Sequence, residues 1–181
     1  MPETQKPILT IIDLNGTADQ MWRFDEVTGR FYPDCPLGDF LREAVKRHSN
    51  MRFGMITGGV VPTPMENFFR SYPEIDFVMQ MPMLGETDFV PNAEAGVTHQ
   101  STRDFLRNAS LIIINNDPDA AVNKRKSIGF FARPQRRDLL GNAPVPFIHY
   151  GREIETQGLL RVLNEKVQEI RGTSGPDEPG L

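Results

Sequence analysis

The sequence has few of the features that mark secreted, membrane-spanning or nucleic-acid-coating proteins. Cys35 is the only cysteine among 181 residues, so no disulfide can form within the chain. No apolar run approaches the ~18 residues that a membrane-spanning helix needs, and the first residues lack the basic and apolar regions of a secretory signal. The net charge of −4 argues against general binding to nucleic acid. We therefore expect a cytoplasmic protein without a membrane partner.

The composition is that of an ordinary folded protein. Hydrophobic residues make up 39% of the chain and charged residues 24%. A chain of this length can bury a core without disulfides or structural metals. We expect one domain over residues 1–172, followed by a disordered tail, rich in Gly and Pro, at 173–181. Nothing in the sequence indicates the oligomeric state.

Apolar segments of two kinds alternate along the chain. Short runs rich in β-branched residues predict strands at 8–12, 51–57, 75–81, 111–115, 127–132 and 145–150. Segments with helical periodicity predict helices at 36–48, 63–71, 101–109, 119–126 and 155–171, the third of them capped by Ser101 or Thr102. Residues 18–36 predict a loop or small hairpin, and residues 82–98 a loop.

This alternation predicts an α/β fold, a three-layer, Rossmann-like, doubly wound sheet whose strands are mainly parallel. Ligands bind at the carboxyl ends of the strands in such sheets. Asp13, Thr57 and Asp117 each follow a predicted strand at that end. If these strands are neighbours, we expect the three side chains to converge on one crevice.

Three short motifs stand at those strand ends, IIDLNGT, FGMITGG and LIIINNDPD. Their order and placement resemble the haloacid dehalogenase-like (HAD) superfamily of phosphohydrolases. The resemblance covers roughly residues 8 to 132, including the helix between the first two motifs. It implies an enzyme of the phosphoric monoester hydrolase class with a HAD-like fold.

The resemblance assigns roles in phosphate chemistry to the first two motifs. Asp13 matches the nucleophile, which forms an aspartyl-phosphate and, as a carboxylate, needs no base to activate it. Thr57 matches the residue that binds a phosphoryl oxygen through its hydroxyl, helped by nearby backbone amides such as that of Gly58. We therefore expect both residues to contact the phosphate of a substrate.

The resemblance also implies Mg²⁺ as the cofactor, because this hard ion takes oxygen ligands. Asp13, the carbonyl of Leu14 and Asp117 match the ligand positions, and Asp119 matches a position that ligates through water or supports Asp117. The match is uncertain by one residue here, so Asn116 is an alternative to Asp117.

The first departure from the family is Asn15, where the family has the acid that protonates the leaving oxygen and then activates water. An amide cannot transfer a proton, and losing a positioned acid or base typically costs ~10²–10⁴-fold in rate. Three interpretations are open: a slow enzyme acting on activated phosphates, an enzyme whose proton donor lies elsewhere, or a binding site without turnover. Candidates for another donor are His99, His149 and Asp19.

The second departure is a missing lysine before the strand of the third motif. The chain contains no Lys between Lys46 and Lys124. Arg103, on the helix before that strand, is the best substitute, and Arg107 is the next. A guanidinium keeps its charge and can bridge two oxygens.

Many members of the family carry a cap domain, inserted after the first or the second motif, that closes over small substrates. Neither span has room for a full cap in this chain, so we expect a capless protein with an open site. An open site favours a large substrate, such as a polynucleotide end or a phosphoprotein, unless a neighbouring subunit serves as the lid; nucleotide phosphates are a further candidate. The acid-free segment at 123–137 supports a polyanion. Its Arg133, Arg136 and Arg137 follow a predicted strand and should lie on the crevice side, whereas residues 124–126 should form a solvated face.

The sequence therefore predicts a Mg²⁺-dependent phosphatase that uses Asp13. The alternative is a catalytically impaired relative that binds a phosphorylated, nucleic-acid or protein partner.

Overall fold

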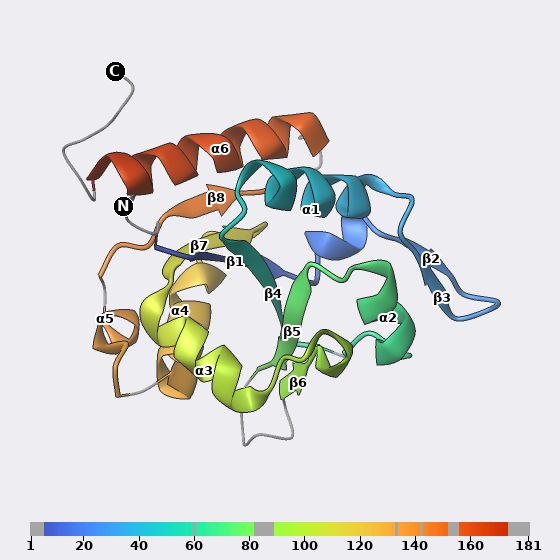
Figure 1. The fold of residues 1–181 in the computed structure, drawn as a ribbon, viewed down its shortest axis with the longest axis horizontal. Coiled ribbons are helices and arrows are strands. Elements are labelled where there is room, and N and C mark those ends of the chain that lie inside the picture. Colours follow the sequence, from blue (N-terminus) through green and yellow to red (C-terminus); the bar gives the residue numbers. More distant parts are fainter. Residues whose placement is uncertain are drawn as a thin grey trace.

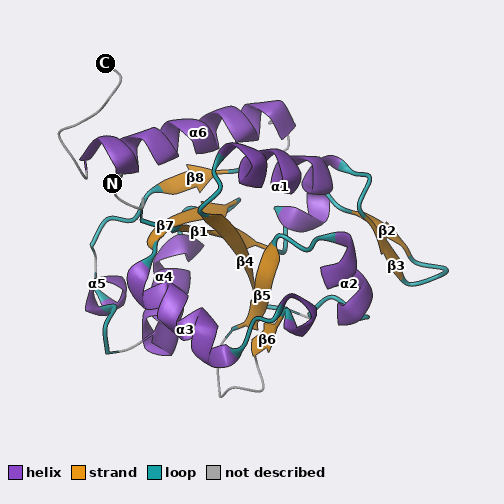
Figure 2. Ribbon diagram, viewed as in Figure 1, coloured by secondary structure: helices purple, strands orange, loops and turns teal. Residues whose placement is uncertain are grey.

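A six-stranded, mostly parallel sheet forms the centre of the computed structural model, which describes residues 6–59, 61–81, 89–132, 134–141, 143–151 and 156–173. The strand order is β6-β5-β4-β1-β7-β8, and only β6 runs antiparallel to its neighbour (Figures 1 and 2). The strands are β1 (Ile8–Asp13), β4 (Met51–Thr57), β5 (Ile75–Gln80), β6 (Phe89–Pro91), β7 (Ser110–Asn115) and β8 (Phe147–His149). The predicted α/β class with a mainly parallel sheet is confirmed.

Helices cover both faces of this sheet (Figure 1). One face carries α1 (Pro36–Arg47), α2 (Met65–Ser71) and α6 (Thr156–Thr173), and the other carries α3 (His99–Asn108), α4 (Ala120–Ala132) and α5 (Arg137–Leu140). None of the helices in the described ranges is long and apolar enough to cross a membrane.

The central strand β1 is buried along its whole length between β4 and β7. Its side chains alternate between the two faces, as in any strand. Ile8 and Ile12 pack in the core beneath α1 and α6, whereas Leu9 and Ile11 pack in the core beneath α3 and α4. Burial of each such side chain is worth ~1.5–3 kcal/mol, so the strand that ends in Asp13 is firmly held.

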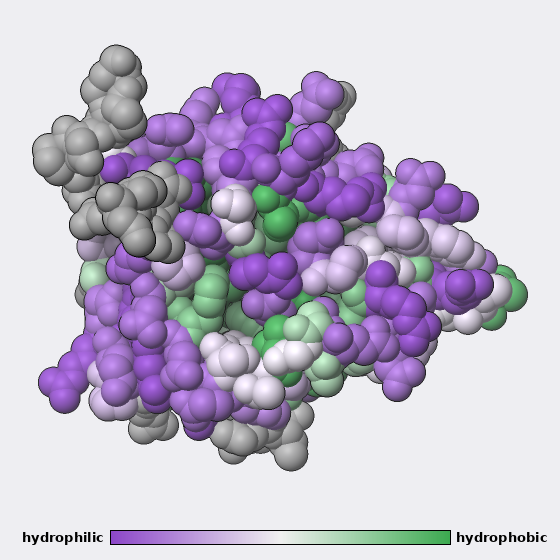
Figure 3. Space-filling model, viewed as in Figure 1, coloured by the Kyte–Doolittle hydropathy of each residue, from purple (hydrophilic) through white to green (hydrophobic). Residues whose placement is uncertain are grey.

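A small hairpin follows β1 and lies beyond the carboxyl ends of the parallel strands (Figure 1). It comprises β2 (Arg23–Asp25) and β3 (Arg30–Tyr32) and pairs with no strand of the main sheet. Helix α2 anchors it, because Ser71 Oγ donates to the Phe31 carbonyl at 2.7 Å and the Phe31 ring packs edge-on against Phe68. Val27, in the turn between the two strands, is 95% exposed, and Figure 3 shows a small apolar spot among polar atoms at the end of the hairpin. The prediction of a loop or small hairpin is confirmed.

Three local predictions were wrong. Residues 127–132 continue helix α4 rather than forming a strand. The predicted loop at 82–98 contains the short edge strand β6, while residues 82–88 lie outside the described residues. Helix α3 starts earlier, because Thr98 caps it by accepting from the Ser101 amide, so Ser101 is inside the helix. The tail was predicted at 173–181, but Thr173 is the last residue of α6, and residues 174–181 lie outside the described residues.

Candidate functional site

Asp13 ends the central strand at the carboxyl edge of the sheet and is buried there. After β1 the chain passes to α1 on one face, and after β7 it passes to α4 on the other. Adjacent strands whose connections leave in opposite directions open a crevice between their carboxyl ends. Asp13 lies at that point. As an alternate residue of β1 it faces the same side of the sheet as Leu9 and Ile11, which is the side that α4 covers.

Lys124 of α4 contacts Asp13 directly, through a hydrogen bond from its Nζ to Asp13 Oδ1. The lysine shares the sheet-facing side of α4 with Ile128, Phe131 and Ala132, which follow it at helical spacings. The side chains of the pair are 11% and 6% exposed, so this is a buried ion pair. The prediction that residues 124–126 form a solvated face is wrong for Lys124, although Lys126 is exposed.

Opposing effects act on the Asp13 carboxyl group. Burial raises its pKa above the ordinary value, while the hydrogen bond and the charge of Lys124 lower it and the charge of Asp19 raises it further. The net direction is upward. Lys124 therefore keeps the carboxylate available in a place where burial alone would favour the neutral acid.

The Asn116 side-chain amide lies on the other oxygen of Asp13. One end of this amide is 2.7 Å from Asp13 Oδ2 and 3.1 Å from the Asn15 carbonyl oxygen, with further oxygens of Asn115 and Thr17 at 3.2 and 3.3 Å. Because all four neighbours can accept a hydrogen bond, we assign this end as Nδ2, the donor. Gly16 makes room for the amide, since a Cβ there would lie 2.4 Å from it.

The second motif meets the first through Thr57. Its hydroxyl donates to Asn15 Oδ1 at 2.7 Å and accepts from the Gly59 backbone N–H at 2.9 Å. Gln80, at the end of β5, holds the same turn by donating to the Gly59 carbonyl at 2.7 Å. Gly58 is exposed, and a Cβ there would meet nothing within 4 Å, so space is open above the turn.

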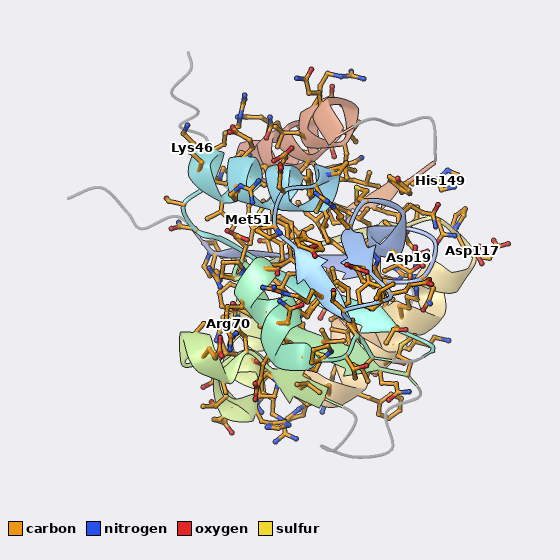
Figure 4. The ribbon with its side chains drawn as sticks, turned by 90° about the vertical axis from the view of Figure 1, so that its right-hand side faces the viewer. Asp19, Lys46, Met51, Arg70, Asp117 and His149 are labelled. Carbon is orange, nitrogen blue, oxygen red and sulfur yellow. The ribbon has the colours of Figure 1, made fainter. Side chains whose placement is uncertain are left out.

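The acids of the third motif lie further out. Asp117 is exposed at the rim (Figure 4), where its carboxylate accepts the Asp119 backbone N–H at 2.9 Å. Asp119 is exposed as well. The Leu14 carbonyl accepts the Asp19 backbone N–H at 3.0 Å, and the carbonyl that faces the Asn116 amide belongs to Asn15. The structure therefore brings Asn116 to Asp13, the alternative that the sequence left open.

The arginines predicted to act on substrate have other contacts. The Arg103 guanidinium lies over the Phe131 ring, 5.0 Å from its centroid, so the cation beside Asp13 is Lys124 and not Arg103. Arg136 Nη1 donates to the carbonyls of Leu106 and Ala109 at 3.0 and 2.9 Å, which satisfies the carboxyl end of α3.

The rest of the basic segment is divided between interior and surface. Arg125 donates to the Ala143 carbonyl, so it ties α4 to the segment before β8. Arg137 is exposed at the start of α5, and Arg133 lies outside the described residues. The predicted crevice-side cluster depended on a strand at 127–132, and because that segment is helical the reason for it is lost.

The oxygens around Asp13 fit a magnesium ion in chemistry but carry little charge. No group of three or more His, Cys, Asp or Glu side chains in the described ranges could hold a metal. An ion here would instead take the Asp13 carboxylate, the Asn15 carbonyl and, with its amide reversed, the Asn116 side-chain oxygen. Since only one of these ligands is charged, we expect a weak site.

The fold and the site together define an α/β protein with a buried Asp–Lys pair at the carboxyl edge of its sheet. Comparisons of the chain with protein-family models, with curated proteins and with solved structures found no match. Lys124 is the residue of this site that the sequence reasoning missed. A signal for it exists, because Lys124 and Ile128 are one helical turn apart once residues 120–132 are taken as one helix.

Proposed function

We propose that this chain is a Mg²⁺-dependent phosphoric monoester hydrolase with a HAD-like, Rossmann-like fold, in which Asp13 attacks phosphorus and becomes an aspartyl-phosphate. The observation that carries the proposal is the buried Asp13–Lys124 pair at the carboxyl end of the central strand. A buried carboxylate held by a cation at such a crevice is a common form of a catalytic nucleophile.

Lys124 has two roles in this proposal. Its ammonium keeps Asp13 ionised against the burial that raises the pKa of the carboxyl group. The same charge lies where negative charge collects as a phosphate dianion approaches, and a fixed cation there lowers the energy of the transition state. In the family, the charge-balancing cation comes before the strand that leads into LIIINNDPD-like acids, whereas in this proposal Lys124, which follows β7, has that role.

The turn at residues 57–59 supports binding of the phosphoryl oxygens. The Thr57 hydroxyl donates to Asn15 Oδ1, two residues beyond Asp13, and the Gly59 backbone N–H donates to that hydroxyl; in this proposal both donors turn to the phosphoryl oxygens when substrate binds. Because the space above Gly58 is open, a phosphate can approach the turn without steric conflict. Magnesium, held by Asp13, the Asn15 carbonyl and Asn116, would reduce the repulsion between the carboxylate and the phosphate.

A specific observation also favours a second candidate, a phosphate-binding module without turnover. Amides occupy two positions where the family resemblance expects acids, at Asn15 and, beside Asp13, at Asn116. Amides preserve hydrogen bonds but transfer no protons. This candidate predicts binding of phosphate or a phosphorylated partner without release of product.

The test measures Mg²⁺-dependent phosphate release from an aryl phosphate and from 3′- and 5′-phosphorylated oligonucleotides. We expect release by the natural protein and none by Asp13→Asn, which keeps an acceptor oxygen for Lys124. Because this variant leaves the lysine buried without its counter-charge, circular dichroism must show that it is folded. Asp25→Asn is the matched control, because it makes the same substitution at a carboxylate that accepts a hydrogen bond, from the Val27 backbone N–H at 2.9 Å, but lies on the hairpin. Release that survives Asp13→Asn would exclude the proposal, and binding without release would favour the second candidate.

A further inference from the structure

The two halves of the proposed reaction differ in whether they need a proton to be transferred, which the amide of Asn15 cannot do. In the first half an oxygen of Asp13 attacks phosphorus, and the bond to the leaving oxygen breaks with its electron pair on that oxygen. A nitrophenolate or a carboxylate leaves without a proton, so this half needs no acid. In the second half water attacks the phosphoryl group, and its proton must pass to a base before phosphate leaves and the Asp13 carboxylate is restored.

The contacts of Asn15 show what the second half lacks. Asn15 Oδ1 accepts the Thr57 hydroxyl hydrogen at 2.7 Å, so this oxygen is already engaged, and an amide has no proton to exchange. Aspartate has the same shape and can accept the same hydrogen. Replacement of Asn15 by Asp therefore changes the capacity for proton transfer while keeping the Thr57 contact.

The titratable side chains around this loop make contacts of their own. Asp19 Oδ1 accepts the Gly16 backbone N–H at 2.8 Å and holds the turn after β1. His149 Nε2 is 3.1 Å from the Asn116 carbonyl oxygen, and because a carbonyl only accepts, this nitrogen donates its hydrogen there. Lys124 is bound to Asp13 itself. In these contacts Asp19, His149 and Lys124 are hydrogen-bonded to Gly16, Asn116 and Asp13, and none of these hydrogen bonds is made to Asn15.

We propose that this protein forms the phosphoaspartate on Asp13 readily from activated donors but hydrolyses it slowly, so that the phosphorylated protein accumulates. This inference rests on the proposed function. The ligand class is a small acyl or aryl phosphate, whose leaving group departs as an anion. The chemistry is that of a phosphoryl-accepting protein, with the phosphoryl group stored beside the Lys124 ammonium.

The experiment mixes the full-length protein, Mg²⁺ and 4-nitrophenyl phosphate or acetyl phosphate. Nitrophenolate release is followed in time, and intact mass is measured after an acid quench. We expect a burst of one nitrophenolate per chain, then a steady rate ~10²–10⁴-fold below that of Asn15→Asp. The quenched natural protein should carry one added phosphoryl group on Asp13 that hydroxylamine removes, and Asn15→Asp should carry little.

Two controls make the result specific. Asp13→Asn should show neither burst nor added mass. Asn108→Asp places the same substitution at an exposed position on α3 and should behave like the natural protein. Circular dichroism of each variant checks that it is folded.

The outcomes separate this inference from the proposed function. Steady turnover that depends on Asp13, with no phosphorylated protein at the quench, would overturn the accumulation and leave the phosphatase proposal standing. If Asp19→Asn then produced the burst, Asp19 would be the acid–base group. Absence of both nitrophenolate and added mass, in the natural protein and in Asn15→Asp alike, would overturn both proposals.

Discussion

Replacing Lys124 with Met should destabilise the protein by about 3–4 kcal/mol at neutral pH. Exposed ion pairs are worth ~0–1 kcal/mol, but here the two side chains are 11% and 6% exposed, and removal of one partner of a buried pair costs ~3–5 kcal/mol. Protonation of Asp13 limits the loss. At neutral pH, roughly three units above the ordinary pKa of a carboxyl group, protonating Asp13 costs ~4 kcal/mol, at ~1.4 kcal/mol per unit. The variant cannot lose more than this, because beyond it the carboxyl group takes up a proton.

The same reasoning fixes the dependence on pH. Burial raises the pKa of Asp13 in the folded state, so the folded protein binds the proton more tightly than the unfolded chain. The stability that this group contributes is therefore fully present below the unfolded pKa and is lost as the pH rises through the folded pKa. Without Lys124 the pKa of Asp13 in the folded state rises further. The range of pH between the unfolded and folded pKa values of Asp13 therefore becomes wider. The cost of Lys124→Met should thus shrink to under ~1 kcal/mol near pH 4.

Urea unfolding followed by circular dichroism measures these free energies at neutral pH and at about pH 4. Lys126→Met is the matched control, since Lys126 is exposed on the same helix and should change stability by less than ~0.5 kcal/mol. Asp13→Asn combined with Lys124→Met should recover most of the loss, because no buried charge remains. A cost below ~1 kcal/mol at neutral pH, unchanged in acid, would refute the buried ion pair.

Three further predictions concern neighbouring features. Arg136→Ala should lower the free energy of unfolding by ~1–3 kcal/mol, because the α3 carbonyls lose their donor, and should leave oligonucleotide affinity unchanged in a filter-binding assay. Gly16→Ala should cost at least ~1 kcal/mol in urea unfolding, because φ is 84° and the new Cβ would strike Asn116. Asn116→Asp should tighten Mg²⁺ binding at least ~10-fold by calorimetry, since a nearby charge at an effective dielectric of about 20 is worth several kcal/mol; an unchanged affinity would place the ion elsewhere.

The sheet and most helices could be predicted because the spacing of their apolar residues reflects a single cause, the burial of one or both faces of the element. Ile8 to Ile12 form a run that is apolar on both faces, which suits only a buried strand, and Pro36 followed by apolar residues at helical spacing predicts α1. The convergence of strand ends follows from parallel order, and β1 does lie between β4 and β7. These inferences use only local pattern and the geometry of parallel sheets.

Lys124 could not be found in the same way, because its burial depends on a partner far along the chain. Residues 127–132 form a short, mostly apolar run, in which periodicity alone does not distinguish a strand from a buried helix, and Phe130 is 54% exposed in the helix that forms. A lysine on the buried side of that helix weakens the helical pattern further. The error in secondary structure then displaced the arginines after it, so Arg136 was predicted on the crevice rather than at the end of α3.

The side-chain amides of Asn15 and Asn116 maintain the hydrogen bonds of the site but cannot transfer protons. The site can therefore keep its structure whether or not it completes a reaction. Asn15 joins Thr57 to the first motif, and Asn116 joins Asp13 to the loop after β7, so each makes a contact that a carboxylate or its protonated form could also make. Neither adds negative charge, and the one carboxylate between them is balanced by Lys124. Lys124 thus favours the ionised form of Asp13 and the strand ends are held together, while the capacity to move a proton is absent at both positions. In the proposed reaction, Asn15→Asp supplies that capacity and also adds one negative charge near Asp13. The loss of the phosphoryl group from the quenched protein, rather than a change in Mg²⁺ affinity, is therefore the result that distinguishes a slow phosphatase from a site that retains its phosphoryl group.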